Sequence, residues 1–99
     1  MIAIKISSLG KSSFADVSEF VLFIWNIKVL QQFIDLVEKS CVQLKENPDL
    51  GIPFSKKIRK IVLHKNASMY YEYDEMNKVI TILLFIDNRQ NPKDYLKLL

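Results

Sequence analysis

The sequence has few of the residues on which disulfide-rich or metal-bound small domains depend. Its 99 residues include one cysteine, Cys41, and one histidine, His64. A single cysteine excludes an internal disulfide, and neither residue has a Cys or His partner nearby at ligand spacing. Cys41 falls among the apolar positions of a helical pattern, which predicts a side chain buried in the core. We therefore expect no metal and no cofactor.

Long hydrophobic runs are also absent. The longest, residues 20–25, is far shorter than the ~20 residues that a membrane-spanning helix needs. Residues 1–6 lack the long apolar segment and cleavage site of a signal peptide. The sequence therefore predicts a cytoplasmic protein with no membrane partner.

The excess of positive over negative charge is small. Lys and Arg number 14 against 11 Asp and Glu, which gives a net charge of +3 and a pI near 9.0. This bias is compatible with nucleic acid or with an acidic protein partner, and it does not decide between them. A hydrophobic share of 49% is that of a folded chain, and the length suits a single domain over residues 1–99.

The last third of the chain predicts a β-hairpin. Residues 68–74 contain three tyrosines, and aromatic residues favour strands. Residues 74–78 are polar and include Asn77, a residue type that tolerates turn conformations. Residues 79–86 are aliphatic or β-branched at nearly every position. This pattern is typical of a central strand that is covered on both faces.

The three tyrosines do not form a stacking platform for single-stranded nucleic acid. Because side chains alternate along a strand, Tyr71 and Tyr73 share one face while Tyr70 points to the other. We interpret them as residues that pack the sheet.

A strand and a helix are predicted at the start of the chain. Ile2, Ile4 and Ile6 alternate with other residues, as in a half-buried strand. Residues 11–25 then carry apolar side chains at the spacing of a helix face. The apolar stripe widens in residues 20–25, which predicts either deep packing or a second surface for a protein partner.

A second helix follows directly. Asn26 is its expected N-cap, and the helix runs to residue 46. Asn47 and Pro48 then end it, because the residue before proline is disfavoured in a helix. The short connection between the two helices predicts an antiparallel helical hairpin.

The remaining segment contains a loop over residues 49–55 and a strand over residues 58–64. A basic run, Lys56, Lys57, Arg59 and Lys60, leads into that strand and is interpreted as a solvated edge. The element order is thus β-α-α-β-β-β. It predicts an α+β fold in which an antiparallel sheet packs against the helical hairpin.

Several short sequence motifs occur along these elements. They are Trp25-Asn26 between the helices, Leu44-Lys-Glu-Asn-Pro48, Ile58-Arg-Lys-Ile-Val62, Tyr70-Tyr-Glu-Tyr73 and Ile82-Leu-Leu-Phe-Ile-Asp-Asn-Arg-Gln-Asn-Pro92. In their order and spacing the chain resembles the RelE/ParE family of toxins from bacterial type II toxin–antitoxin (plasmid stabilisation) systems. The resemblance covers almost the whole chain.

This resemblance implies a small toxin that a co-expressed antitoxin neutralises. ParE-like members inhibit DNA gyrase. RelE-like members enter the ribosome and cut mRNA. For a RelE-like nuclease, the resemblance assigns catalytic roles to Arg59, Arg89 and Tyr95.

The residues favour the ParE-like branch. A toxin of this branch would bind and inhibit its target without catalysing a reaction. Ser68 and Met69 lie near the position where the nuclease toxins tend to have a further arginine, and no histidine lies in the C-terminal segment. His64 is expected at a strand end rather than beside Arg89. Arg89 has an alternative role, pairing with Asp87 or with the C-terminal carboxylate, and Tyr95 has one in packing the tail. A third interpretation is a toxin that has lost its activity but still binds the antitoxin.

Overall fold

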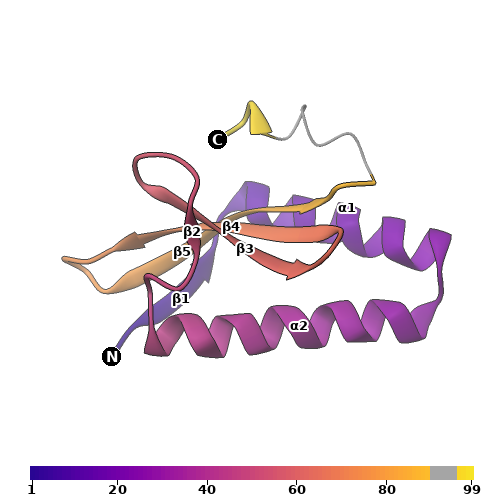
Figure 1. Cartoon of the computed structure of the whole chain (residues 1–99), viewed down its shortest axis with the longest axis horizontal. Coiled ribbons are helices and arrows are strands. Elements are labelled where there is room, and N and C mark those ends of the chain that lie inside the picture. Colours follow the sequence, from indigo (N-terminus) through magenta and orange to yellow (C-terminus); the bar gives the residue numbers. More distant parts are fainter. Residues whose placement is uncertain (90–95) are drawn as a thin grey trace.

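The computed structural model contains one helical hairpin and one five-stranded sheet, and it describes residues 1–89 and 96–99 (Figure 1). The sheet order is β1-β5-β4-β3-β2. The elements are β1 (Ala3–Ile6), α1 (Ser8–Ile24), α2 (Ile27–Glu46), β2 (Ile52–Pro53), β3 (Ile58–His64), β4 (Ala67–Asp74) and β5 (Val79–Asp87).

The predicted α+β arrangement is confirmed, but the sheet is mixed, so the expectation of a wholly antiparallel sheet is wrong in one pair. β2, β3, β4 and β5 pair antiparallel, whereas β1 runs parallel to β5, with Ala3 opposite Val79 and Ile6 opposite Ile82. The alternation of isoleucines predicted a strand correctly. It could not predict the direction, because side chains alternate in the same way in parallel and antiparallel strands.

Three further features differ from the prediction. Helix α1 begins at Ser8 rather than at residue 11, because the Ser7 hydroxyl accepts a hydrogen bond from the Gly10 N–H (3.0 Å) and caps the helix. The short strand β2 lies inside the predicted loop. Cys41 is half-buried beside the core rather than fully buried, and burial raises the pKa of its thiol.

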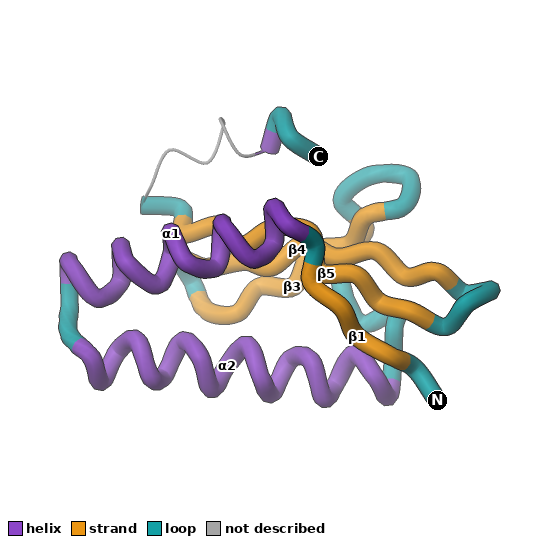
Figure 2. The backbone as a smooth tube through the Cα atoms, turned by 180° about the vertical axis from the view of Figure 1, so that it is seen from behind, coloured by secondary structure: helices purple, strands orange, loops and turns teal. Residues whose placement is uncertain are grey.

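Both helices cover the same face of the sheet (Figure 2). Between them and the sheet lies the main core, in which the rings of Phe14, Phe33 and Phe85 meet at centroid distances of 5.2 to 6.4 Å. Tyr71 is buried in this core and Tyr73 packs against it, while Tyr70 is buried in a second cluster with Ile58, Leu84 and Ile86. The predicted alternation of the tyrosines is therefore confirmed.

The second cluster explains why β5 is apolar on both faces. It lies on the face of the sheet opposite the main core, and its partly buried neighbours include Leu9 from the first turn of α1, Leu96 and Leu99. Leu84 and Ile86 of β5 are buried there, while Ile82 and Phe85 are buried in the main core. The prediction of an interior strand over residues 79–86 is confirmed.

The outer edge of β5 is completed by helix α1. Strand β1 pairs with residues 79–82 only, and beyond this point the Phe85 N–H donates a hydrogen bond to the Ser13 hydroxyl (2.9 Å). Gly10 allows this close approach, because a Cβ at that position would lie 2.6 Å from the Ile82 carbonyl oxygen. Two small residues of α1 therefore let the helix lie directly against a strand edge.

We expect Gly10→Ala to destabilise the protein by about 1–3 kcal/mol, the usual cost of overpacking. Alanine is the better helix former, so helix propensity alone predicts the opposite sign. Urea denaturation of Gly10→Ala beside Lys11→Ala, an exposed change on the next residue, measures the difference. A Gly10→Ala variant as stable as the wild type would show that α1 can move away from the Ile82 carbonyl without loss of stability.

Within residues 1–89 and 96–99, neither helix combines the length and the hydropathy that a membrane span requires.

Candidate functional site

Arg89 lies two residues beyond the last residue of β5, and its guanidinium has an acidic and two aromatic neighbours. Its Nε donates a hydrogen bond to Asp87 Oδ1 (2.8 Å), and its Nη2 donates to Asp87 Oδ2. The guanidinium carbon lies 5.7 Å from the ring centre of Phe20 and 5.9 Å from that of Trp25. The alternative role of Arg89, pairing with Asp87, is therefore confirmed, and two aromatic rings of α1 and its C-cap add to it.

The partner of Arg89 is a fully buried carboxylate. Burial alone would raise the pKa of Asp87, but the hydrogen bonds and charge of Arg89, with a smaller effect of His64, outweigh it. The pKa of Asp87 therefore lies below its usual value, and that of Arg89 lies above its own.

This ion pair predicts how stability depends on pH. The pKa of Asp87 is lower in the folded state than in the unfolded state. Its contribution is therefore fully present above about pH 4, the usual value for Asp, and is lost as the pH falls through the folded-state pKa. Urea denaturation between pH 7 and pH 2.5 should show a steeper acid loss for the wild type than for Asp87→Asn. Equal slopes would contradict the assignment.

Arg59 has a different role, which is to hold the loop after α2. Its Nη1 donates hydrogen bonds to the carbonyl oxygens of Gly51 (2.8 Å) and Asp49 (3.2 Å). The Tyr71 hydroxyl holds the same loop, because it donates to the Pro48 carbonyl (2.7 Å) and accepts from the Gly51 N–H (2.9 Å). Arg59 Nη1 thus binds two backbone carbonyls of its own chain, and Nη2 lies 3.8 Å from Asp49 Oδ1.

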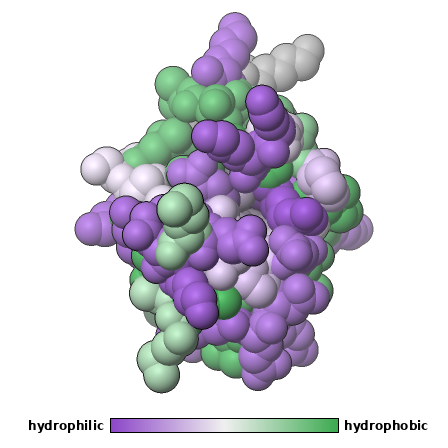
Figure 3. Space-filling model, turned by 90° about the vertical axis from the view of Figure 1, so that its left-hand side faces the viewer, coloured by the Kyte–Doolittle hydropathy of each residue, from purple (hydrophilic) through white to green (hydrophobic). Residues whose placement is uncertain are grey.

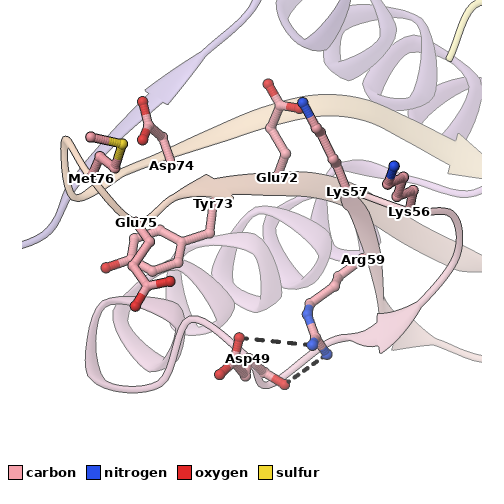
Figure 4. A pocket seen from close by; sticks show the side chains of 9 residues that line it. All are labelled: Asp49, Lys56, Lys57, Arg59, Glu72, Tyr73, Asp74, Glu75 and Met76. Carbon is pink, nitrogen blue, oxygen red and sulfur yellow. Dashed lines mark hydrogen bonds and ion pairs between the residues drawn. The ribbon is translucent and has the colours of Figure 1, made fainter.

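The end of the molecule to which the β4–β5 hairpin points is largely hydrophilic (Figure 3). A polar pocket of about 620 Å³ lies there, between the loop before β3 and the hairpin. Figure 4 shows its walls, which carry both signs of charge: Asp49, Lys56, Lys57, Arg59, Glu72, Asp74 and Glu75. The basic run therefore lies beside acidic side chains, and the pocket has no single charge preference.

The structure does not bring the two predicted catalytic arginines together. Arg59 contacts the loop that follows the last residue of α2, whereas Arg89 lies against Trp25, just before the first residue of α2. A helix of 20 residues separates these ends by about 30 Å. Tyr95 lies outside the described residues. Among the described residues, no group of three His, Cys, Asp or Glu side chains could hold a metal ion.

Three large apolar side chains are exposed at the tip of the helical hairpin, and one of them, Trp25, lies against Arg89. Phe23 is 89% exposed, Trp25 59% and Ile27 72%; we call these three residues the hairpin-tip patch. Residues 20–25 thus include an exposed surface, which was one of the two outcomes expected for this run. The patch extends into the first turn of α2, which the sequence reasoning did not include.

A second apolar feature adjoins this patch. A pocket of about 540 Å³ lies between α1, α2 and the β3–β4 turn, with Trp25, Phe33 and Leu36 among its apolar residues. His64, Lys65 and Arg89 line it too. The sequence predicted that His64 is no metal ligand and that it lies at a strand end rather than beside Arg89. The second expectation is wrong, because His64 and Arg89 line the same pocket. No local pattern predicts that the end of β3 and the turn after it meet the helices.

Comparison with known proteins supports the fold but no more. No family model matches the chain, and no curated protein matches it. Among solved structures, the chain is similar to the isolated RelE toxin of E. coli, with a TM-score of 0.62 and 10% sequence identity over 100% of both chains. At this identity the likeness concerns the fold alone, so the chain has the fold of the RelE toxin.

Proposed function

We propose that this chain is the toxin of a type II toxin–antitoxin pair in the bacterial cytoplasm, with a ParE-like action in which it binds and inhibits DNA gyrase. The observation that carries the assignment as a toxin is the likeness to the RelE toxin over the full length of both chains. The choice of a ParE-like action rests on the surroundings of Arg59 and Arg89. The motifs at Asn47-Pro48 and at the end of β5 support it.

The surroundings of the two arginines support binding rather than cleavage. Cleavage of RNA by its 2′-oxygen needs a group that takes a proton, a group that gives one, and cations on the phosphate. The guanidinium of Arg89 is already engaged by Asp87, and that of Arg59 by loop carbonyls. Neither arginine is left with all its donors for a phosphate.

The second candidate is a ribosome-dependent mRNA endonuclease that uses Arg59, Arg89 and Tyr95. The name of the similar structure, a RelE toxin, favours it. So does the exposure of the Arg89 side chain, of which 27% remains accessible. A toxin that keeps only antitoxin binding is the third candidate.

Two assays separate these candidates, DNA supercoiling by gyrase and mRNA cleavage coupled to translation. We expect supercoiling to be inhibited while mRNA stays intact, and Tyr95→Phe to have almost no effect. Codon-positioned cuts that fall by about 10²–10³-fold in Arg89→Ala, the usual cost of removing a stabiliser of transition-state charge, would overturn this choice. An inactive protein that still binds the antitoxin would support the third candidate.

The proposal includes an antitoxin that covers the hairpin-tip patch. Large exposed apolar surfaces on a folded protein mark sites of interaction with proteins, membranes or ligands. Trp25 is the only tryptophan of the chain, so its fluorescence should shift to shorter wavelength when the product of the adjacent gene binds. Unchanged emission, together with no rescue of growth on co-expression, would contradict this partner.

A further inference from the structure

The pocket between α1, α2 and the β3–β4 turn has the size and the lining of a small-molecule site. Its volume of about 540 Å³ lies within the range of about 300–1,000 Å³ that is usual for ligand pockets. Val21 and Phe33, which belong to the main core, form part of its lining, and Trp25, Val29 and Leu36 extend the apolar surface around them. A ligand with an apolar body can therefore displace water from this surface.

Most polar groups of this pocket belong to the end of β3 and the β3–β4 turn, and the backbone of that turn is fixed. The Asn66 N–H donates a hydrogen bond to His64 Nδ1 (3.2 Å), and the Asn66 carbonyl accepts one from the Asn88 N–H (2.6 Å). Because Nδ1 of His64 is an acceptor, its Nε2 carries the ring hydrogen and is a donor. The turn therefore holds its polar side chains in place before a ligand binds, which lowers the entropy lost on binding.

The charged side chains of the pocket, Lys65 and Arg89, are both cationic. No carboxylate lines it among the residues that the structure describes. Asp87, which pairs with Arg89, is fully buried and does not belong to the lining. This differs from the polar pocket of Figure 4, which mixes both signs. Charge complementarity therefore favours an anionic ligand over a neutral or a cationic one.

We propose that this pocket binds a small aromatic carboxylate, with its ring against Trp25 and its carboxylate at Lys65 and His64. The Trp25 side chain is 59% exposed, and a second aromatic ring can pack on it in a stacked or edge-to-face arrangement. The guanidinium of Arg89 is already bound by Asp87, so we assign the carboxylate to the β3–β4 turn. This ligand site goes beyond the proposed toxin function and does not depend on it.

The test is a titration of the isotope-labelled full-length chain with 2-naphthoate, followed by NMR. 2-Naphthamide has the same ring system without the charge and is the matched probe. Gln32→Glu places a carboxylate in the pocket lining, and Gln43→Glu, the same change on α2 outside this pocket, is its control. Lys65→Gln removes a cation from the lining, and Lys45→Gln, also outside the pocket, is the control for net charge.

We expect 2-naphthoate to shift the signals of the Asn66 amide and the Trp25 indole N–H until they saturate. The affinity for 2-naphthamide should be about tenfold weaker, which corresponds to the loss of one hydrogen bond to a charged group. Gln32→Glu and Lys65→Gln should each weaken binding of 2-naphthoate by about the same factor, while the two controls bind like the wild type.

The same spectra check that each variant is folded, because signals far from the pocket should not move. Equal affinity for the two probes, or wild-type affinity in both pocket variants, would overturn the proposal. So would a titration without saturable shifts, or one whose shifts are confined to Phe23 and Ile27 of the hairpin-tip patch. None of these outcomes changes the toxin function, which the supercoiling and mRNA cleavage assays test separately.

Discussion

Replacing Arg89 by methionine is expected to destabilise the fold by about 3 kcal/mol. The change removes the cation that faces the fully buried Asp87 carboxylate, and breaking a buried ion pair by removing one partner usually costs about 3–5 kcal/mol. The low end of this range applies because the Arg89 backbone N–H still donates to Asp87 and because the guanidinium was partly exposed. Urea denaturation at pH 7 measures the loss.

The same variant should invert the acid response. Without the cation, burial raises the pKa of Asp87 above its unfolded value, so the folded state favours the protonated carboxyl. Stability should then rise as the pH is lowered from 7 toward 4, where the wild type shows no gain. The double variant Asp87→Asn, Arg89→Met should recover most of the lost stability. A single variant as stable as the wild type at pH 7 would contradict the buried pair.

This expectation bears on the functional assays. Loss of toxicity in Arg89→Ala can arise from an unfolded protein as well as from a missing phosphate contact. Only an Arg89 variant that is still folded at the assay temperature tests catalysis.

The second large effect is expected for Leu84→Ala, at about 2–5 kcal/mol. Leu84 is fully buried in the second cluster, opposite Tyr70 in the register of the β4–β5 pair. A smaller side chain leaves a cavity between β5 and the second cluster, and the surrounding sheet has little freedom to close it. In a chain of 99 residues, each kcal/mol lowers the melting temperature by roughly 4–8 °C.

Thermal denaturation of Leu84→Ala beside Leu83→Ala checks this prediction. Leu83 lies on the same strand but is only half-buried, so its truncation should cost less than half as much. Equal costs would show that the second cluster is not a tightly packed core.

The sequence predicted the elements well where one physical pattern dominated. The apolar run of β5 requires cover on both faces, and the Asn26 side chain does cap α2 by accepting a hydrogen bond from the Val29 N–H (3.0 Å). Such signals are local, because they depend on residues a few positions apart. The element order and the helical hairpin followed from them.

The features that were missed depend on residues far apart in the chain. Ser13 binds the backbone of Phe85, and Gly10 lies against Ile82. Nothing near Ser13 or Gly10 in the sequence indicates a strand edge, so the start of α1 was placed too late. The parallel direction of β1 was missed for the same reason.

The candidate site was predicted only in part. Pairing between Arg89 and Asp87 was foreseen because only Asn88 lies between them in the sequence. The large distance between Arg89 and Arg59 was not foreseen, because it is set by the length and path of α2. His64 joined the site only through the tertiary packing of the β3–β4 turn.

The parallel pairing of β1 with β5 has a consequence for the order in which the chain can fold during synthesis. Ala3 and its partner Val79 are 76 positions apart, so the first strand to be made has no neighbouring strand until the last strand has been translated. Until then Phe14 and Phe33 also lack Phe85, their aromatic partner from β5. Pairing over such a sequence separation is slow. The nascent helical hairpin therefore keeps its apolar face uncovered for most of translation, when a chaperone or an antitoxin already present can bind it.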